Sequence, residues 1–263
     1  MLTIGADPEF WLVNRDTGRP VSAHDLEGAL GTKGAPRALD CGGGVQVDGT
    51  AVEFNIVPAS TAEEFVENMR LALNEVRQLV PYRYAFNFSP VRFYTPAMWE
   101  KIPEKAKEIG CDPELHARYA PYVRRHLKKA RRARGVGGHL HFGWTTGRNT
   151  KDDPQHQFDC KFFAQMCACN IPITVSKLLG NHDEERLRIE YTGYGGFSSY
   201  RVKPYGMEYR ALSSRWVSRP DTWRPLFNFC KRLFEVSRNM ERAARLSDLA
   251  VPIDDYKPHT WMR

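Results

Sequence analysis

The sequence predicts an α+β fold in which β-strands form a sheet backed by amphipathic helices. Four short segments alternate polar and apolar side chains, the pattern of a strand with one buried face; they span residues 4–12, 45–56, 137–143 and 206–212. Longer segments repeat apolar residues at helical intervals, and they span residues 60–80, 158–179 and 220–246. A length of 263 residues fits one large domain, residues 1–263.

The first strand has Asp7 and Glu9 on one face and Pro8, Phe10 and Leu12 on the other, since successive side chains of a strand point to opposite faces. Pro8 donates no backbone hydrogen bond, so we expect this strand at an edge of the sheet or with a bulge near its carboxylates. The segment therefore offers two acids on one side and a core face on the other.

Residues 45–56 predict a hairpin that turns at Asp48–Gly49. Its second strand places Glu53 and Asn55 together on the polar face. The helix that follows opens at Ser60–Glu64, which has the spacing of a capping box. Its apolar stripe should pack against the sheet.

The segment Gly137–Gly143 places His139 and His141 on one face of a strand and Leu140 and Phe142 on the other. The apolar pair needs a core, whereas two imidazoles can coordinate a metal or donate to an anion. This pattern is typical of a strand at the floor of an active site. Taken alone, it also fits polar residues on the solvated face of a sheet.

The remaining elements continue the same scheme. Residues 158–179 predict a buried helix that is kinked or interrupted near Pro172. The last strand places Glu208 and Arg210 on one face, and residues 220–246 predict a long amphipathic helix.

If the four polar faces belong to one sheet, four carboxylates crowd together and cannot all ionise without cations between them. A divalent metal supplies that charge, and sites rich in carboxylates with few imidazoles suit Mg²⁺ or Mn²⁺, which accompany nucleotide phosphates. Arg210 adds a planar cation suited to a phosphoryl group. The alternative is four unrelated strands with solvated polar faces.

Four sequence blocks, in order from residue 5 to about residue 216, carry a family resemblance. They are Gly5-Ala6-Asp7-Pro8-Glu9-Phe10, Gln46-Val47-Asp48-Gly49 with Glu53-Phe54-Asn55, Gly138-His139-Leu140-His141, and Tyr205-Gly206-Met207-Glu208-Tyr209-Arg210. Together they resemble the signature of the phage-type carboxylate–amine ligases (amidoligases, type 2), a compact branch of the glutamine synthetase and glutamate–cysteine ligase superfamily. The resemblance implies an ATP-dependent ligase with a curved antiparallel sheet around its active site and helices on the outer face.

The resemblance also implies metal ligands. Glu9 and Glu53 would hold a metal on the substrate side, with Glu53 also counted among the catalytic residues. Asp7, His139 and Glu208 would hold the metal that bridges the ATP phosphates. The larger members of the superfamily usually carry Glu-x-Glu on the first strand, where this chain has Asp7-Pro8-Glu9.

The phosphoryl group and the tetrahedral intermediate would be steadied by His141, Arg201 and Arg210, which the resemblance implies as catalytic and nucleotide-binding residues. Lys203, just before the last strand, and Lys33, in a glycine-rich loop, complete the expected nucleotide contacts. The loop lacks the spacing of a Walker motif. A solvated loop lysine is the alternative for Lys33.

Composition and charge set wider limits. The net charge of +7 indicates anionic ligands, either nucleotide phosphate or another polyanion. No signal peptide is visible and no apolar run reaches the roughly 18 residues of a membrane span, so we expect a cytoplasmic protein without a membrane partner, in the host cytoplasm if it is phage-encoded. The sequence leaves the oligomeric state open.

A basic run precedes the histidine strand, with seven basic residues among eleven in residues 124–134. They are Arg124, Arg125, Lys128, Lys129, Arg131, Arg132 and Arg134. The run fits a solvated helix face, a border of the site that attracts an acidic substrate or polyphosphate, or a docking segment for nucleic acid. We expect the second and do not favour nucleic acid.

A carboxylate is a poor electrophile, so a ligase of this kind first transfers the γ-phosphoryl group of ATP to it, and the amine then attacks the acyl phosphate. We therefore expect ATP with Mg²⁺ or Mn²⁺ as cofactors, release of ADP and phosphate, and a carboxylate and an amine, acidic or peptidic in character, as substrates. Two other functions fit the same residues: a metal-dependent nuclease or other phosphoesterase, and a catalytically silent nucleotide-binding or assembly protein.

Overall fold

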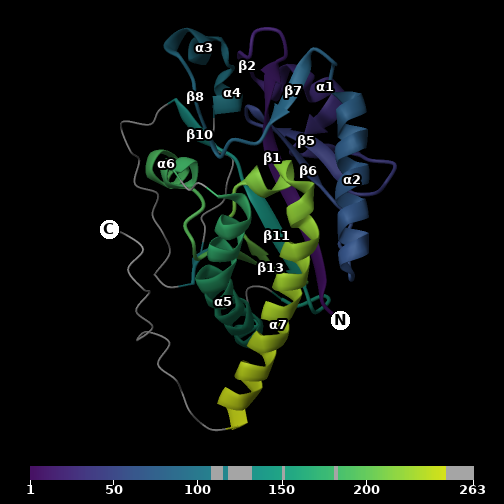
Figure 1. The fold of residues 1–263 in the computed structure, drawn as a ribbon, viewed down its shortest axis with the longest axis vertical. Coiled ribbons are helices and arrows are strands. Elements are labelled where there is room, and N and C mark those ends of the chain that lie inside the picture. Colours follow the sequence, from purple (N-terminus) through teal and green to yellow (C-terminus); the bar gives the residue numbers. More distant parts are fainter. Residues whose placement is uncertain (108–114, 118–131, 150–151, 181–182, 247–263) are drawn as a thin grey trace.

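One large sheet packed against long helices forms the body of the protein (Figure 1). The computed structural model describes residues 1–107, 115–117, 132–149, 152–180 and 183–246. The architecture is α+β, as the sequence predicts, and the pairings in the sheet are antiparallel apart from one short parallel contact between Thr32 and Val47.

The strands of the main sheet that follow one continuous path are β1 (Thr3–Asn14), β3 (Gly31–Thr32), β4 (Ala35–Ala38), β5 (Gly44–Asp48), β6 (Ala51–Asn55), β9 (Leu115–His116), β11 (Gly138–Gly143), β12 (Ser199–Lys203) and β13 (Gly206–Tyr209). Their spatial order is β3–β4–β5–β6–β1–β11–β13–β12–β9. Two further strands pair with β1, namely β2 (Pro20–Val21) and β7 (Tyr84–Asn87). A separate two-stranded sheet contains β8 (Val91–Phe93) and β10 (Ala133–Gly135).

Strand β1 lies in the centre of the sheet, between β6 and β11. The expectation that Pro8 places it at an edge is therefore wrong. A change of register does occur nearby: Ile4 bridges Ala59 whereas Glu9 pairs with Glu53, so the partner segment has one residue more than β1 between the two pairings. This local irregularity accommodates a residue that has no backbone donor.

The predicted hairpin is formed by β5 and β6. Asp48 pairs with Ala51, which leaves Gly49 and Thr50 as a two-residue turn. Gly49 has φ of 59°, in the left-handed region that such turns require. The turn fixes the register that brings Gln46 opposite Glu53.

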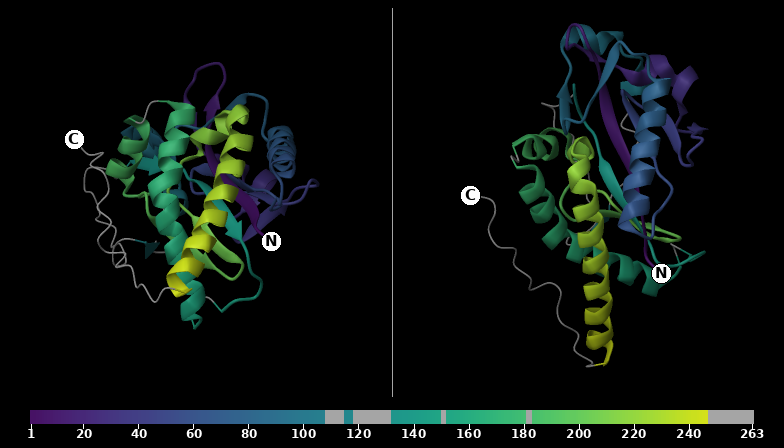
Figure 2. Two further views of the ribbon diagram at one scale, coloured as in Figure 1. Left: turned by 60° about the horizontal axis from the view of Figure 1, so that its bottom comes forward. Right: turned by 45° about the vertical axis from the view of Figure 1, so that its right-hand side comes forward.

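Three long helices cover the apolar face of the sheet (Figure 2). They are α2 (Ala62–Leu79), α5 (Pro154–Leu179) and α7 (Trp223–Leu246). Helix α2 begins with the predicted capping box, in which Thr61 and Glu64 exchange hydrogen bonds. On the sheet, Phe142 packs edge-on against Phe163 of α5, with 5.0 Å between ring centroids. The polar face is therefore opposite to these helices.

Shorter helices connect the main elements. They are η1 (Ala23–Leu26), α1 (Glu27–Leu30), α3 (Pro96–Lys101), α4 (Glu104–Lys107), α6 (Asp183–Thr192), η3 (Ser214–Ser218) and η4 (Pro220–Thr222). Helix α6 packs on β8 and β10, and the loop that follows it leads into β12.

Helix α5 differs from its prediction in two respects. It runs through Pro172 as one element of 26 residues, so the helix is not interrupted there, and the alternative of a kink stays a prediction. It is also long and apolar enough to cross a bilayer, with a mean hydropathy of 1.3 in its most apolar window, whereas the sequence reading found no such run. One such helix is weak support for a membrane span, because core helices of soluble proteins meet the same criteria.

Candidate functional site

Five adjacent strands present their polar side chains on one face of the sheet. Directly paired residues of an antiparallel sheet share a face, and the pairings that connect the predicted site are Glu9 with Glu53, Asp7 with His139, and Glu208 with both His141 and Arg201. Alternation along β1 and β11 joins these pairs into one set. The predicted site residues on β6, β1, β11, β13 and β12 therefore converge, as the alternation predicts.

The centre of this face is a histidine cluster, which we define as Asp7, His139, His141 and Glu208. His139 Nδ1 lies 3.1 Å from Asp7 Oδ1 and 3.5 Å from Glu208 Oε1. His141 Nε2 lies 2.9 Å from Asp7 Oδ2. One carboxylate thus faces both imidazoles.

Three cations, Arg201, Lys203 and Arg210, surround the carboxylate of Glu208, whose side chain is only 1% exposed. Lys203 Nζ lies 3.0 Å and Arg201 Nη1 3.3 Å from Glu208 Oε2, and Arg210 contacts Oε1. Arg210 follows the end of β13 and is held by a backbone hydrogen bond to Ser199. We call Arg201, Lys203 and Arg210 the cation group.

These charges decide the ionisation of the histidine cluster. Burial and the charge of Asp7 act to raise the pKa of Glu208, but His139, Arg210 and His141 outweigh them and lower it to about 2. Burial likewise opposes ionisation of Asp7, yet His141 and His139 hold its pKa well below the usual range. Burial lowers the pKa of His141, and the carboxylate of Asp7 more than compensates, so that it is raised. Both carboxylates of the cluster are therefore held in the ionised form.

Beside it lies an acidic cluster, which we define as Glu9, Asp48 and Glu53. One oxygen from each carboxylate can be chosen so that all three lie within 4.8 Å of one another. Glu9 accepts a hydrogen bond from the backbone N–H of Gly137 at 3.0 Å, and Gln46 donates to Glu53 at 2.8 Å. These bonds orient the carboxylates without neutralising them.

The acidic cluster holds protons more tightly than isolated acids do. Burial, followed by the charges of Glu53 and Asp48, raises the pKa of Glu9 well above its usual value. Burial, followed by the charges of Asp7 and Asp48, raises the pKa of Glu53 to about 8. A cation placed among the three oxygens would relieve this repulsion.

Both clusters fit divalent metal ions. The ligand sets that the geometry groups together are Asp7, His141 and Glu208 in one place and Glu9, Asp48 and Glu53 in the other. In the histidine cluster, Asp7 Oδ1, His139 Nδ1 and His141 Nε2 are buried, and each imidazole nitrogen lies close to an oxygen of Asp7, at 3.1 Å for His139 and 2.9 Å for His141. Buried oxygen and nitrogen atoms that converge in this way can serve as metal ligands.

This grouping differs from the predicted one in two residues. His141, predicted to contact the phosphoryl group, lies within the first ligand set, where His139 was predicted. Asp48 joins the second set although the sequence reading treated it as a turn residue. Alternation could have identified it, because Asp48 and Gln46 are two residues apart on one strand and their side chains share the polar face.

Two tyrosines that sequence reasoning missed complete the histidine cluster. The hydroxyl of Tyr205 hydrogen-bonds His141 Nδ1, and the hydroxyl of Tyr194 hydrogen-bonds His139 Nε2. Each histidine therefore has one ring nitrogen held by a tyrosine and the other facing Asp7. Tyr205 could have been identified only from its place at the start of the fourth sequence block. Tyr194 lies in a loop whose sequence has no periodic pattern.

The remaining predicted cations lie apart from the cation group or outside the described residues. Lys33 lies at the acidic cluster, with Nζ 3.6 Å from Asp48 Oδ2, and its side chain is 54% exposed. In the basic run, Arg132 and Arg134 alone are among the described residues. The guanidinium of Arg134 packs over Trp99, 4.4 Å from the ring centroid. The expected border of the site by this run thus falls mostly outside the described residues.

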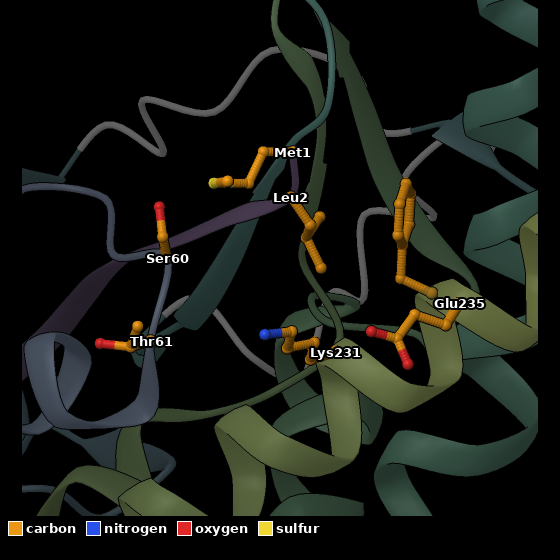
Figure 3. Close-up of a pocket in the computed structure, with 7 residues that line it drawn as sticks. Met1, Leu2, Ser60, Thr61, Lys231 and Glu235 are labelled. Carbon is orange, nitrogen blue, oxygen red and sulfur yellow. The ribbon is translucent and has the colours of Figure 1, made fainter.

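A pocket of about 410 Å³ lies elsewhere, between the start of β1, the start of α2 and helix α7 (Figure 3). Met1, Leu2, Ser60, Thr61, Lys231, Phe234 and Glu235 line it. None of the predicted site residues is among them.

The chain matches no protein-family model and no curated protein sequence. The resemblance to the amidoligases therefore rests on the four sequence blocks alone.

Proposed function

We propose that this protein is an ATP-dependent carboxylate–amine ligase that forms an amide bond through an acyl phosphate. The observation that carries the proposal is the sequence of charges across one face of the sheet: the cation group, then the histidine cluster, then the acidic cluster. This order supports an anionic phosphate at one end and a cationic or metal-bound substrate at the other. We also propose that the sheet is the curved catalytic sheet of the glutamine synthetase-like fold.

The cation group is suited to the transferred phosphoryl group. Arg201 and Arg210 offer planar forks of donors, and Lys203 offers a compact ammonium. In the structure these cations neutralise Glu208. A phosphate that approached this carboxylate would meet three preorganised donors, which is how such sites stabilise the charge of phosphoryl transfer.

Two metal ions fit the same face. Asp7, His141, Glu208 and the adjacent His139 would hold one, and Glu9, Asp48 and Glu53 the other. When bound, Mg²⁺ or Mn²⁺ would neutralise phosphate oxygens and orient the reacting groups. In the metal-free protein Glu53 is mostly protonated at neutral pH, since its pKa is raised to about 8, and a bound cation would favour the ionised carboxylate that ligates it.

Incubation of the purified protein with Mg-ATP and pooled metabolites tests the proposal. We expect formation of ADP and phosphate, together with a product whose mass equals the sum of a carboxylate and an amine minus one water. Glu208→Gln, purified in the same way, controls for contaminating ATPases.

Three other outcomes would contradict the ligase proposal. Release of AMP and pyrophosphate would replace the acyl phosphate by an adenylate. Cleavage of DNA or RNA without ATP would favour the nuclease alternative, which the same acids and histidines could serve. Nucleotide binding without turnover of any pool would favour the catalytically silent alternative.

A further inference from the structure

We propose that Tyr194 is a positioning residue that sets the orientation of both His139 and Arg210, and that Arg188 of helix α6 fixes Tyr194 in place. The proposal rests on the metal-dependent function proposed above and extends it to residues outside the strands. Tyr194 belongs to the loop between α6 and β12 and is 6% exposed. Its hydroxyl hydrogen-bonds His139 Nε2 and lies 3.2 Å from Arg210 Nη2. One hydroxyl therefore joins the histidine cluster to the cation group.

The contact on Nε2 decides what Nδ1 of His139 can do. Nδ1 lies 3.1 Å from Asp7 Oδ1 and 3.5 Å from Glu208 Oε1 and is buried. In metal sites, a partner that accepts the outer ring N–H leaves the lone pair of the other nitrogen directed inward. Tyr194 supplies a partner for Nε2 of His139, so that Nδ1 faces the two carboxylates and could present its lone pair to a cation bound between them.

Arg188 holds the aromatic ring of Tyr194. Its side chain is fully buried, and its guanidinium carbon lies 5.7 Å from the ring centroid; the guanidinium carbon of Arg210 lies 5.5 Å from the same centroid. Arg188 also donates to the carbonyl of Ala211, the residue after Arg210, and its Nε lies 3.3 Å from Glu185. Helix α6 is thereby connected to the end of the last site strand through one arginine.

Three glycines leave the space that this arrangement occupies. A Cβ at Gly195 would lie 2.2 Å from Arg188 Nη1, and a Cβ at Gly137 would lie 2.1 Å from His139 Nε2. A Cβ at Gly135 would lie 3.1 Å from Arg188 Cγ. The backbone around Arg188, Tyr194 and His139 therefore admits these side chains only because it carries none of its own at these positions.

Tyr194→Phe removes the hydroxyl and nothing else, and Tyr209→Phe is the matched control. Tyr209 lies on β13 beside Glu208, is fully buried, and donates its hydroxyl to the carbonyl of Phe197 at 2.7 Å. Each variant loses one buried hydroxyl, with its bonds to His139 and Arg210 in Tyr194→Phe and its bond to Phe197 in Tyr209→Phe, so general loosening of the fold affects both. The full-length chain is labelled with ¹⁵N-histidine, and the His139 signals are assigned with His139→Gln.

Titration with Mn²⁺ then reads the site directly, through paramagnetic broadening of the His139 ring signals. In the parent protein we expect Mn²⁺ to broaden the His139 ring signals. In Tyr194→Phe we expect a changed ¹⁵N chemical shift of Nε2 and a Mn²⁺ affinity lower by about 10- to 100-fold, the usual effect of losing a partner behind a metal ligand. Tyr209→Phe should keep the parent values, and Arg188→Met should shift them in the same direction as Tyr194→Phe, by less.

An unchanged Nε2 chemical shift and Mn²⁺ affinity in Tyr194→Phe would overturn the proposal, as would an equal loss of Mn²⁺ affinity in Tyr209→Phe. A loss in Tyr194→Phe with parent values in Arg188→Met would overturn the role of Arg188. Failure of this inference is distinct from failure of the proposed function. In the first case the parent protein still binds Mn²⁺ and forms ADP; in the second it does neither, and the inference fails with it.

Discussion

Two neighbouring groups of carboxylates on one face of the sheet have pKa values that are shifted in opposite directions. In the histidine cluster, the pKa of Glu208 falls to about 2 although burial acts to raise it, because histidines and Arg210 outweigh burial. In the acidic cluster, burial and the charges of Asp7 and Asp48 raise the pKa of Glu53 to about 8. The first cluster is thus balanced by the protein itself, whereas the second requires protons or a bound cation.

This difference assigns different tasks to the two clusters. The histidine cluster is preorganised, since its partners are already in place before any ligand binds, and preorganised charges are those that contribute most to a transition state. In the acidic cluster the carboxylates repel one another until a proton or a cation binds. Removing one charge should therefore change the unfolding free energy in opposite directions in the two clusters.

The largest effect is expected from Glu208→Gln on catalysis. The substitution keeps the size of the side chain but removes the charge that three cations and the metal site share. ADP formation should fall by on the order of a hundredfold or more, the scale of losing one major electrostatic contact. The rate is normalised to folded protein by circular dichroism; a rate close to that of the parent at saturating Mg²⁺ would leave the ligase proposal without its central carboxylate.

Arg210→Lys should be the next most costly. Arg210 is 3% exposed and contacts both Glu208 and Tyr194, and an ammonium cannot reproduce two donors in one plane. We expect a loss on the order of tenfold in ADP formation, or about 1.4 kcal/mol. Arg201→Lys is the control, since the side chain of Arg201 is 27% exposed and has more freedom to adapt. Equal losses in both variants would show that charge alone matters.

The comparison also predicts opposite pH effects on the metal-free protein. Because the pKa of Glu53 is raised from 4.5 to about 8, the folded state binds more protons than the unfolded state in that window, and the unfolding free energy should fall as pH rises through it. Glu208, lowered from 4.5 to about 2, contributes stability that is complete above 4.5 and is lost as pH falls. Urea unfolding in EDTA at a series of pH values measures both effects.

Saturating Mg²⁺ should reduce the fall in unfolding free energy between about pH 4.5 and pH 8. The same fall with and without Mg²⁺ would contradict a metal at the acidic cluster.

The smallest effect is expected at Lys33. Its side chain is half exposed and its ammonium lies 3.6 Å from Asp48, and exposed ion pairs contribute about 0–1 kcal/mol. Lys33→Met should therefore change the unfolding free energy by less than about 0.5 kcal/mol. A reduction of ADP formation beyond about threefold, roughly 0.6 kcal/mol, would instead give Lys33 the nucleotide contact that the resemblance implies.

The polar face of the sheet could be predicted because alternation is a local property of a strand. Asp7 and Glu9, or His139 and His141, share a face whatever strand lies beside them. The pairing of Asp7 with His139 joins segments far apart in the sequence, and alternation alone could not select it. The sequence analysis supposed that the four polar faces belong to one sheet, and it did not predict which strands pair.

The residues that were missed lie where local patterns end. Asp48 is the last residue of β5, next to a turn, where a polar residue has an ordinary explanation, and its place in the acidic cluster depends on the register of the hairpin. Tyr194 lies in a glycine-rich loop, and its position is fixed by Arg188 from a different element. Such contacts arise from packing between different helices, strands and loops, and no periodic pattern in the sequence predicts them.

The stability of two metal-free variants tests the central contrast most directly. Glu208→Gln leaves the buried guanidinium of Arg210 without its carboxylate, so the unfolding free energy should fall by about 3 kcal/mol. Glu53→Gln removes a charge from a crowded acidic site, so it should rise by about 1 kcal/mol at about pH 8.5. Both are measured by urea unfolding of the full chain in EDTA. Changes of opposite sign are the predicted result, and destabilisation of similar size in both variants would contradict the account.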